Sequence, residues 1–203
     1  MKKNKISKNW INKQKRDIYV RQSKIEGYRS RAVYKLQEIN EKFKILKKDI
    51  LVVDLGAAPG SWSQFISRKF KNSKIVSIDI KEMDSINNTL QIKGDFTDES
   101  QQKKIIDCFD DKIDVVISDM AVNTTGNKNV DSLVTGELCI EALNFACNTL
   151  KNQGCFVSKM FMGLSFNEIV VTAKKKFKEV HIFKPPSSRK DSKENFIICK
   201  YLR

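Results

Sequence analysis

A turn bounded by two glycines is the first feature of this sequence whose residue types could do chemistry. The apolar run over residues 50–55 breaks at Gly56, and Gly60 closes a five-residue turn before a helix-like stretch. Glycine lets a ligand approach bare backbone, and the amide groups that begin a helix favour negatively charged groups. The pattern predicts the first strand and ligand-binding turn of a nucleotide-binding α/β fold.

The spacing of the glycines narrows the class of ligand. A dinucleotide-binding turn has glycines at its first, third and sixth positions, and a phosphate-binding loop ends in Gly-Lys-Ser/Thr. Neither pattern occurs here, and Pro59 stands between the two glycines. A ligand without a pyrophosphate fits better, and S-adenosylmethionine is the common candidate. An ordinary strand-to-helix turn is the alternative at this point.

Charged residues stand where successive strands are expected to end. Asp79 ends the second strand, Asp95 follows the third, Asp119 ends the fourth and Lys159 lies near the end of the fifth. Parallel strands end at one edge of a sheet, where ligands bind. We expect Asp79 to accept the ribose hydroxyls of an adenosine ligand and Asp95 to bind its amino group, with Phe96 near the ring. Each residue alone is typical of a solvated loop, but four in register favour a site.

Alternating strand-like and helix-like segments predict the scaffold that positions these residues. Strands are expected over residues 50–55, 74–80, 89–92, 114–118, 155–161, 180–183 and 196–201. Helices are expected over residues 30–43, 62–70, 98–109, 132–150 and 165–177. This alternation predicts an α/β, Rossmann-like fold whose mostly parallel seven-stranded sheet has helices on both faces. No helix separates the last two strands, so the sheet should end in an antiparallel hairpin.

Length and composition favour one globular domain outside the membrane. The chain has 203 residues, of which 40% are hydrophobic, and no apolar run reaches the ~20 residues of a membrane helix. The basic N-terminus lacks the apolar region of a secretory signal. We expect a basic N-terminal arm over residues 1–22, a single domain over residues 23–203, and a cytoplasmic monomer.

The strong positive charge favours a polyanionic partner. Thirty-eight basic and 24 acidic residues give a net charge of +14, which points first to nucleic acid. The alternative explanation of the charge is an AT-rich genome, because such genomes enrich proteins in Lys, Asn and Ile without a functional cause. We expect Arg29, Arg31, the N-terminal arm and residues 184–193 to form a basic track for RNA phosphates.

Cysteine and histidine usage argues against a metal site. The five cysteines are scattered without a C-x-x-C pair, and His181 is the only histidine. This is typical of reduced core thiols, and a single histidine disfavours Ser-His-Asp chemistry. We expect no metal, and a packed or edge position for His181.

Several motifs together resemble those of the FtsJ/RrmJ-type ribosomal RNA 2′-O-methyltransferases. They are Asp-Leu-Gly-Ala-Ala-Pro-Gly-Ser-Trp-Ser-Gln at 54–64, Ser-Asp-Met-Ala at 118–121, Ser-Ser-Arg at 187–189 and the segment at 30–36. The resemblance runs from about Tyr28 to the C-terminus. It implies S-adenosylmethionine-dependent 2′-O-methylation of a ribose, that of a uridine in large-subunit ribosomal RNA, within the assembled large subunit.

The same resemblance implies roles for individual residues. It gives a catalytic tetrad of Lys35, Asp119, Lys159 and Glu194. It also gives contacts to the methyl donor from Gly60, Trp62, Asp79, Asp95 and Asp119. The sequence departs from the family at Ser61, where a second glycine is usual, and at Val122, where proline is usual. Ser61 is expected to narrow the approach to the donor, and Val122 to loosen the loop after Asp119.

The chemistry leaves two roles open for Lys159. A ribose hydroxyl that attacks the methyl group loses a proton, so positioning and proton removal are the tasks of the protein. A lysine is a base only when it is neutral, a form that burial and the nearby Lys35 favour and that Asp119 and Glu194 oppose. Lys159 is therefore either a base or an orienting cation.

Two other functions stay open from sequence. The same chemistry could serve transfer RNA or an mRNA cap, although no added binding module is seen. A non-catalytic RNA-binding assembly factor is the alternative from another class, and the four intact tetrad residues argue against it.

Overall fold

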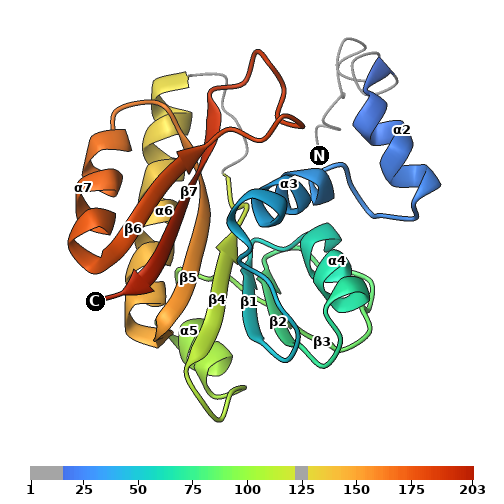
Figure 1. The fold of residues 1–203 in the computed structure, drawn as a ribbon, viewed down its shortest axis with the longest axis horizontal. Helices are drawn as coiled ribbons and strands as arrows, with labels where there is room; N and C mark the ends of the chain where they lie inside the picture. Colours follow the sequence, from blue (N-terminus) through green and yellow to red (C-terminus); the bar gives the residue numbers. More distant parts are fainter. Residues whose placement is uncertain (1–15, 122–127) are drawn as a thin grey trace, which may run out of the picture.

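A mixed sheet of seven strands forms the centre of the computed structural model, which describes residues 16–121 and 128–203 (Figure 1). The strands lie in the order β3-β2-β1-β4-β5-β7-β6. Their bounds are β1 (Leu51–Leu55), β2 (Lys74–Asp79), β3 (Thr89–Lys93), β4 (Ile113–Ser118), β5 (Leu150–Phe161), β6 (Phe177–Phe183) and β7 (Glu194–Leu202). The expected fold class is confirmed.

The parallel part of the sheet grows outward from β1 in two directions. β1 pairs in parallel with β2 on one side and with β4 on the other. The strand order therefore reverses between β1 and β4, and loops that follow the carboxyl ends of these strands diverge around a crevice. The glycine turn follows β1 and Asp119 follows β4, so both lie at this crevice.

The last two strands form the expected hairpin, and β7 lies between β5 and β6. β7 is antiparallel to both neighbours, and Lys159 of β5 faces Phe196 of β7 in the register. Residue Glu194, which begins β7, pairs with Phe161 at the end of β5. The hairpin thereby returns the C-terminal segment to the edge where the first strands end.

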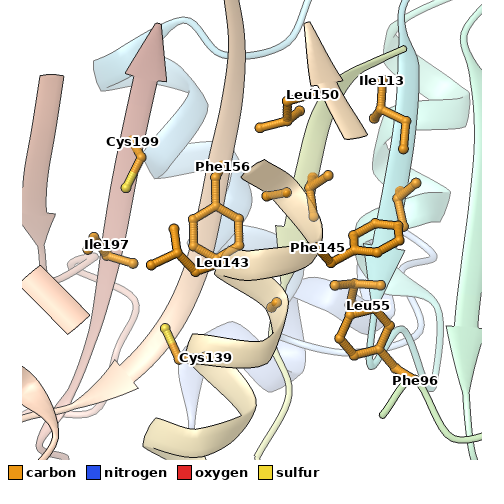
Figure 2. Close-up of a cluster of buried hydrophobic side chains, with 14 of the residues drawn as sticks. Leu55, Phe96, Ile113, Cys139, Leu143, Phe145, Leu150, Phe156, Ile197 and Cys199 are labelled. Carbon is orange, nitrogen blue, oxygen red and sulfur yellow. The ribbon is translucent and has the colours of Figure 1, made fainter. Parts of the chain in front are cut away.

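Helices cover both faces of the sheet because its strands are apolar on both sides. In β1, Val52 packs in one buried cluster with helices α3 (Val33–Phe43) and α4 (Ser61–Lys69). Its neighbour Val53 packs in the other cluster with α5 (Glu99–Ile106), α6 (Lys128–Thr149) and α7 (Phe166–Lys176) (Figures 1 and 2). Burial of both faces is typical of parallel sheets.

Helix α2 (Ile18–Ile25) precedes this domain and crosses the boundary expected at residue 22. Asp17 caps it, because its carboxylate accepts from the backbone amides of Tyr19 and Val20. Helical periodicity over so short a basic stretch was not apparent in sequence. The rest of the expected arm, residues 1–15, lies outside the described residues.

The cysteines and the histidine lie as expected. All five cysteines are free, three of them buried and two partly buried. His181 lies on the outermost strand, with its ring 5.3 Å from the ring of Phe43. Over the part of the chain that the structure describes, no helix is long and apolar enough to cross a membrane.

Candidate active site

The glycine turn after β1 needs glycine at both ends. Gly56 has φ +70°, and a Cβ placed on it would lie 2.4 Å from Cγ of Met120. Gly60 has φ +98°, and its Cβ would lie 2.7 Å from Cδ1 of Ile86. A side chain at either position would meet both a strained backbone and a clash. The turn therefore keeps open backbone at the crevice between β1 and β4.

Arg29 clamps this turn instead of lying in a free basic track. Its guanidinium donates to the carbonyl of Pro59 at 3.1 Å, and to the carbonyls of Asp84 and Ser85 at 2.8 Å each. Three backbone carbonyls thus hold the side chain between the turn and the loop after β2. The expectation that Arg29 serves RNA phosphates is not met by this geometry, because the planar guanidinium fork is already occupied.

The helix that follows the turn begins without a side-chain cap, since Gly60 is its N-cap residue. The first backbone N–H groups of α4 therefore point unpaired toward the turn, which favours a negatively charged ligand group. The Trp62 indole is buried and donates to the carbonyl of Ala32 at 2.7 Å. Trp62 can thus offer a ligand its backbone rather than its ring.

Ser61 does not narrow the crevice in the way expected. Its side chain is buried, and its hydroxyl lies 2.8 Å from the hydroxyl of Ser30. The contact ties α4 to the segment that leads into α3. The other departure from the family pattern, Val122, lies outside the described residues.

Two aspartates flank the turn at the ends of β2 and β3. One oxygen of Asp79 accepts from the Ala58 amide at 2.9 Å, and the other accepts from the Lys81 amide at 2.8 Å. Each carboxylate oxygen keeps a second lone pair for a ligand hydroxyl. Only Oδ1 of Asp95 is engaged, by the amide and hydroxyl of Thr97, which lower the pKa of Asp95. Its Oδ2 is free for a ligand donor.

Phe96 does not pack near the ligand site. Its ring is buried in the core, 5.3 Å from the ring of Phe145 in an edge-on arrangement (Figure 2). The sequence places the residue beside Asp95, but the chain turns there so that the aromatic ring enters the apolar cluster. The expected contact with adenine is therefore wrong.

The four residues of the expected tetrad meet at the carboxyl edge of the sheet. Lys35 Nζ lies 2.8 Å from Glu194 Oε2 and 3.7 Å from Asp119 Oδ1. Lys159 Nζ lies 3.1 Å from the same Asp119 oxygen and donates to the Asp119 carbonyl at 2.6 Å. One carboxylate thus bridges two lysines, and helix α3, strands β5 and β7 and the end of β4 each supply one residue.

Burial and opposite charge act against each other in this group. Burial lowers the pKa of Lys35, but the carboxylates of Asp119 and Glu194 outweigh burial, and its pKa is raised. Burial raises the pKa of Asp119, but the ammonium groups of Lys159 and Lys35 outweigh burial and lower it. Lys35 is therefore an ammonium and Asp119 a carboxylate near neutral pH.

Two neighbouring serines bind the carboxylates of Glu194 and Glu38, and sequence reasoning missed these contacts. The hydroxyl of Ser188 donates to Glu194 Oε1 at 2.8 Å. The neighbouring Ser187 donates from its amide at 3.0 and 3.1 Å and from its hydroxyl at 2.7 Å to the carboxylate of Glu38. Glu38 stands three positions after Lys35, so both lie on one face of α3. This spacing was the signal in the sequence from which a place for Glu38 beside the tetrad could have been predicted.

A buried polar chain supports the turn from below. The hydroxyl of Ser63 lies 2.6 Å from Oδ2 of Asp54 and 2.6 Å from the hydroxyl of Ser77. These residues join β1, α4 and β2. Burial raises the pKa of Asp54 to about 7, with the nearby Asp119 and Asp79 adding to the effect.

Arg31 is also engaged within the protein. It pairs with Asp17 and donates to the carbonyl of Ser187, and Arg189 Nε lies 3.6 Å from the same Asp17 carboxylate. Asp17 thereby fastens α2 beside the tetrad. Of the expected basic track, the loop over residues 184–193 carries the exposed side chains of Lys190 and Lys193.

The residues around the turn fit S-adenosylmethionine. An uncapped helix start suits a carboxylate, the free lone pairs of Asp79 suit ribose hydroxyls, and the free oxygen of Asp95 suits an amino group. Among residues 16–121 and 128–203, no group of three or more His, Cys, Asp or Glu side chains is placed to hold a metal ion.

The sheet order, the glycine turn and the acidic strand ends define a Rossmann-like methyltransferase. Comparison with known proteins makes the assignment narrower, because the model of FtsJ-like methyltransferases matches residues 28–202. The chain belongs to the FtsJ-like methyltransferase family and is an S-adenosylmethionine-dependent enzyme.

Similar proteins carry consistent names. The chain is 66% identical to the ribosomal RNA large subunit methyltransferase E of Pelagibacter ubique (strain HTCC1062), over 100% of both chains. It is 45% identical to the protein of that name from Rickettsia akari (strain Hartford), over 95% of this chain and 88% of the relative. A crystal structure described as a Plasmodium falciparum ribosomal RNA methyltransferase is 36% identical, covers 86% of this chain and 98% of its own, and has a TM-score of 0.78.

Proposed function

We propose that this protein methylates the 2′-oxygen of a ribose, that of a uridine in large-subunit ribosomal RNA, and that the assembled large subunit is its substrate. The observation that carries the proposal is the linked set of Lys35, Glu194, Asp119 and Lys159 beside the glycine turn. The names of the similar proteins from Pelagibacter ubique and Rickettsia akari support the choice of RNA. Such a substrate places the enzyme in the cytoplasm, where we propose that it acts as a monomer.

The reaction requires little of the protein beyond positioning and proton removal. When bound, S-adenosylmethionine supplies a methyl group already activated by its sulfonium, so the 2′-oxygen bonds to the methyl carbon as the carbon–sulfur bond breaks. The hydroxyl proton must leave in the same process, and a placed base contributes ~10²–10⁴-fold to such a step. The product is a methyl ether, and the proton is carried away by the enzyme.

Lys159 is the residue we assign to receive that proton in its neutral form. Its nitrogen is held within 3.1 Å of the carboxylate and 2.6 Å of the carbonyl of Asp119. The raised pKa of Lys35 keeps that residue an ammonium, so it cannot act as the base.

Lys35 and Glu194 are assigned to hold the substrate hydroxyl. Their ion pair is 2.8 Å long, and both side chains are mostly buried. A hydroxyl beside this pair can accept from the ammonium and donate toward Lys159. Asp119 is assigned two tasks, to orient Lys159 and to face the positive charge of the bound donor.

One experiment tests the reaction and the substrate together. The protein is incubated with labelled S-adenosylmethionine and, in parallel, with intact large subunits, free ribosomal RNA and transfer RNA, all unmethylated. The modified nucleotide is then mapped. Label on a ribose 2′-oxygen of large subunits is the expected result. Label on transfer RNA alone, or on a base, would overturn the substrate or the site of transfer. No label on any RNA would favour a non-catalytic assembly factor.

A further inference from the structure

A cavity lies at the edge of the sheet opposite the tetrad. It has a volume of about 650 Å³ and is bordered by the segments that begin β1, β4 and β5 and by the end of β7. In Figure 1 this edge is at the bottom, where β4 begins and β7 ends. Neither the catalytic set nor the glycine turn contributes to its wall.

Lysines dominate the wall of this cavity. Five line it, together with two aspartates: Lys44, Lys47, Lys112, Lys151, Lys200, Asp111 and Asp114. Lys151 forms ion pairs with both aspartates, because its Nζ lies 3.2 Å from a carboxylate oxygen of each. A second oxygen of Asp114 accepts from the Leu51 amide at 2.9 Å. One ammonium thus serves two carboxylates, and the five lysines and two aspartates together leave the wall with a net positive charge.

The other four lysines form no ion pair with a carboxylate among the described residues. The contrast with the catalytic edge is direct, since Lys35 and Lys159 there are both paired with acids. Unpaired ammonium groups that gather around one concavity attract and hold anions.

An aromatic ring stands at the rim in an unusual backbone conformation. Tyr201 has φ +62° near the end of β7, a region that costs a bulky residue on the order of 1–3 kcal/mol. Its ring remains 37% exposed, and Lys200 Nζ lies 5.3 Å from the ring centre. Exposed rings beside lysines are surfaces on which nucleic-acid bases stack.

We propose that this cavity binds a nucleotide unit, with its phosphate among Lys44, Lys47 and Lys112 and its base against Tyr201. The unit belongs either to an RNA strand or to a free nucleotide, which share this chemistry. The apolar floor, formed by Ile45, Ile50 and Val115, suits the flat face of a sugar and base. The proposal does not depend on methyl transfer.

The test compares two triple variants of the full chain that lose the same charge. Lys44→Gln/Lys47→Gln/Lys112→Gln removes three of the four unpaired ammonium groups of the cavity and leaves Lys200 in place. Lys104→Gln/Lys174→Gln/Lys175→Gln removes three exposed lysines from α5 and α7. Binding of ADP and of a short single-stranded RNA is measured over a range of salt. Saturating S-adenosylhomocysteine keeps ADP out of the methyl-donor site.

If the ligand is an RNA strand, the cavity variant should bind the RNA about tenfold more weakly, with a salt slope lower by about 2. If it is a free nucleotide, saturable ADP binding should disappear in the same variant. The control variant should match the wild type in both cases. Tyr201→Asn should weaken the binding of that same ligand. The stability of the protein should not fall, because asparagine tolerates positive φ. Equal binding by the wild type and the cavity variant, or equal losses in both triple variants, would overturn the proposal.

Discussion

Lys35 and Glu194 lie 159 positions apart in the chain and form an ion pair of 2.8 Å. The helix that carries Lys35 precedes every strand, and Glu194 begins the last one. Both partners are mostly buried, with 13% and 12% of their side chains exposed. The pair therefore connects the two ends of the domain at the place where the reaction is proposed to occur.

Loss of the amine at Lys159 should abolish most turnover. Lys159→Ala is expected to lower kcat by ~10²–10⁴-fold, the contribution of a placed proton acceptor. The affinity for S-adenosylmethionine, measured by calorimetry, should change little because Lys159 contacts Asp119 and not the glycine turn. Lys93→Ala, an exposed lysine of β3, is the matched control. Wild-type turnover in a folded Lys159→Ala variant would remove Lys159 from the mechanism.

Neutralising Glu194 should affect the chemical step and leave donor binding intact. Glu194→Gln keeps an acceptor for Ser188 but loses a charge-assisted contact to Lys35, of the kind worth about 1.5–3 kcal/mol. We expect kcat/KM for the RNA to fall about 10–100-fold. The pKa of Lys35 should also fall, because one of the two carboxylates that raise it is gone. An unchanged rate would show that the ion pair is only structural.

Asp79 should determine the affinity for S-adenosylmethionine, and its loss should leave kcat at saturating donor unchanged. Both of its oxygens accept from backbone amides around the turn, and an asparagine nitrogen cannot accept. Asp79→Asn is expected to weaken S-adenosylmethionine binding about 10–100-fold, by the loss of charged hydrogen bonds. The dissociation constant and kcat at saturating donor separate the two effects. Asp107→Asn, an exposed residue after α5, serves as control.

Alanine substitutions at two glycines with nearly the same φ separate the cost of a steric clash from the cost of a strained backbone. Gly27 has φ +68°, and its added Cβ would meet nothing closer than 3.7 Å, whereas the Cβ on Gly56 would strike Met120 at 2.4 Å. Gly27→Ala should therefore cost only the left-handed backbone, about 1–2 kcal/mol in urea unfolding. Gly56→Ala should cost clearly more and weaken donor binding. Equal losses in the two variants would contradict the close packing at Met120.

Asp54 should make the stability of the fold depend on pH. Its pKa of about 7 in the folded protein lies above its ordinary value of 3.8, so the folded state holds the proton more tightly. The resulting stabilisation is complete below pH 3.8 and is lost as the pH rises to about 7. Asp54→Asn removes this titration while it keeps an acceptor for Ser63. Urea unfolding at several pH values should show a weaker pH dependence in the variant than in the wild type.

Local patterns were enough to predict the sheet. The alternation of apolar runs and helical periods gave all seven strands and the closing hairpin. The signal was strongest in the central strands, such as β1 and β4, whose burial on both faces makes the apolar runs unbroken. Boundaries were less accurate where one element passes directly into the next. Helix α6 ends at Thr149 and β5 begins at Leu150, so no turn residue marks the change. Helix α2 was missed because it is only eight residues long.

The site was predicted in part, for a physical reason. Residues at strand ends, such as Asp79 and Asp119, follow from topology, since parallel strands end at one edge. Lys35 and Glu194 came only from the family resemblance, because nothing local ties a helix residue to a distant strand. The clamp by Arg29 and the core position of Phe96 depend on side-chain direction in three dimensions. No sequence period contains that information.

The place of β7 between β5 and β6 also sets an order in time. A ribosome makes a chain from its N-terminus, so Lys35, Asp119 and Lys159 exist well before Glu194 leaves the ribosomal tunnel. Until β7 inserts, Lys35 lacks one of its two counter-charges and β5 has an open edge. The enzyme therefore becomes competent only after β7 has been made, when this strand joins the sheet and completes the catalytic set.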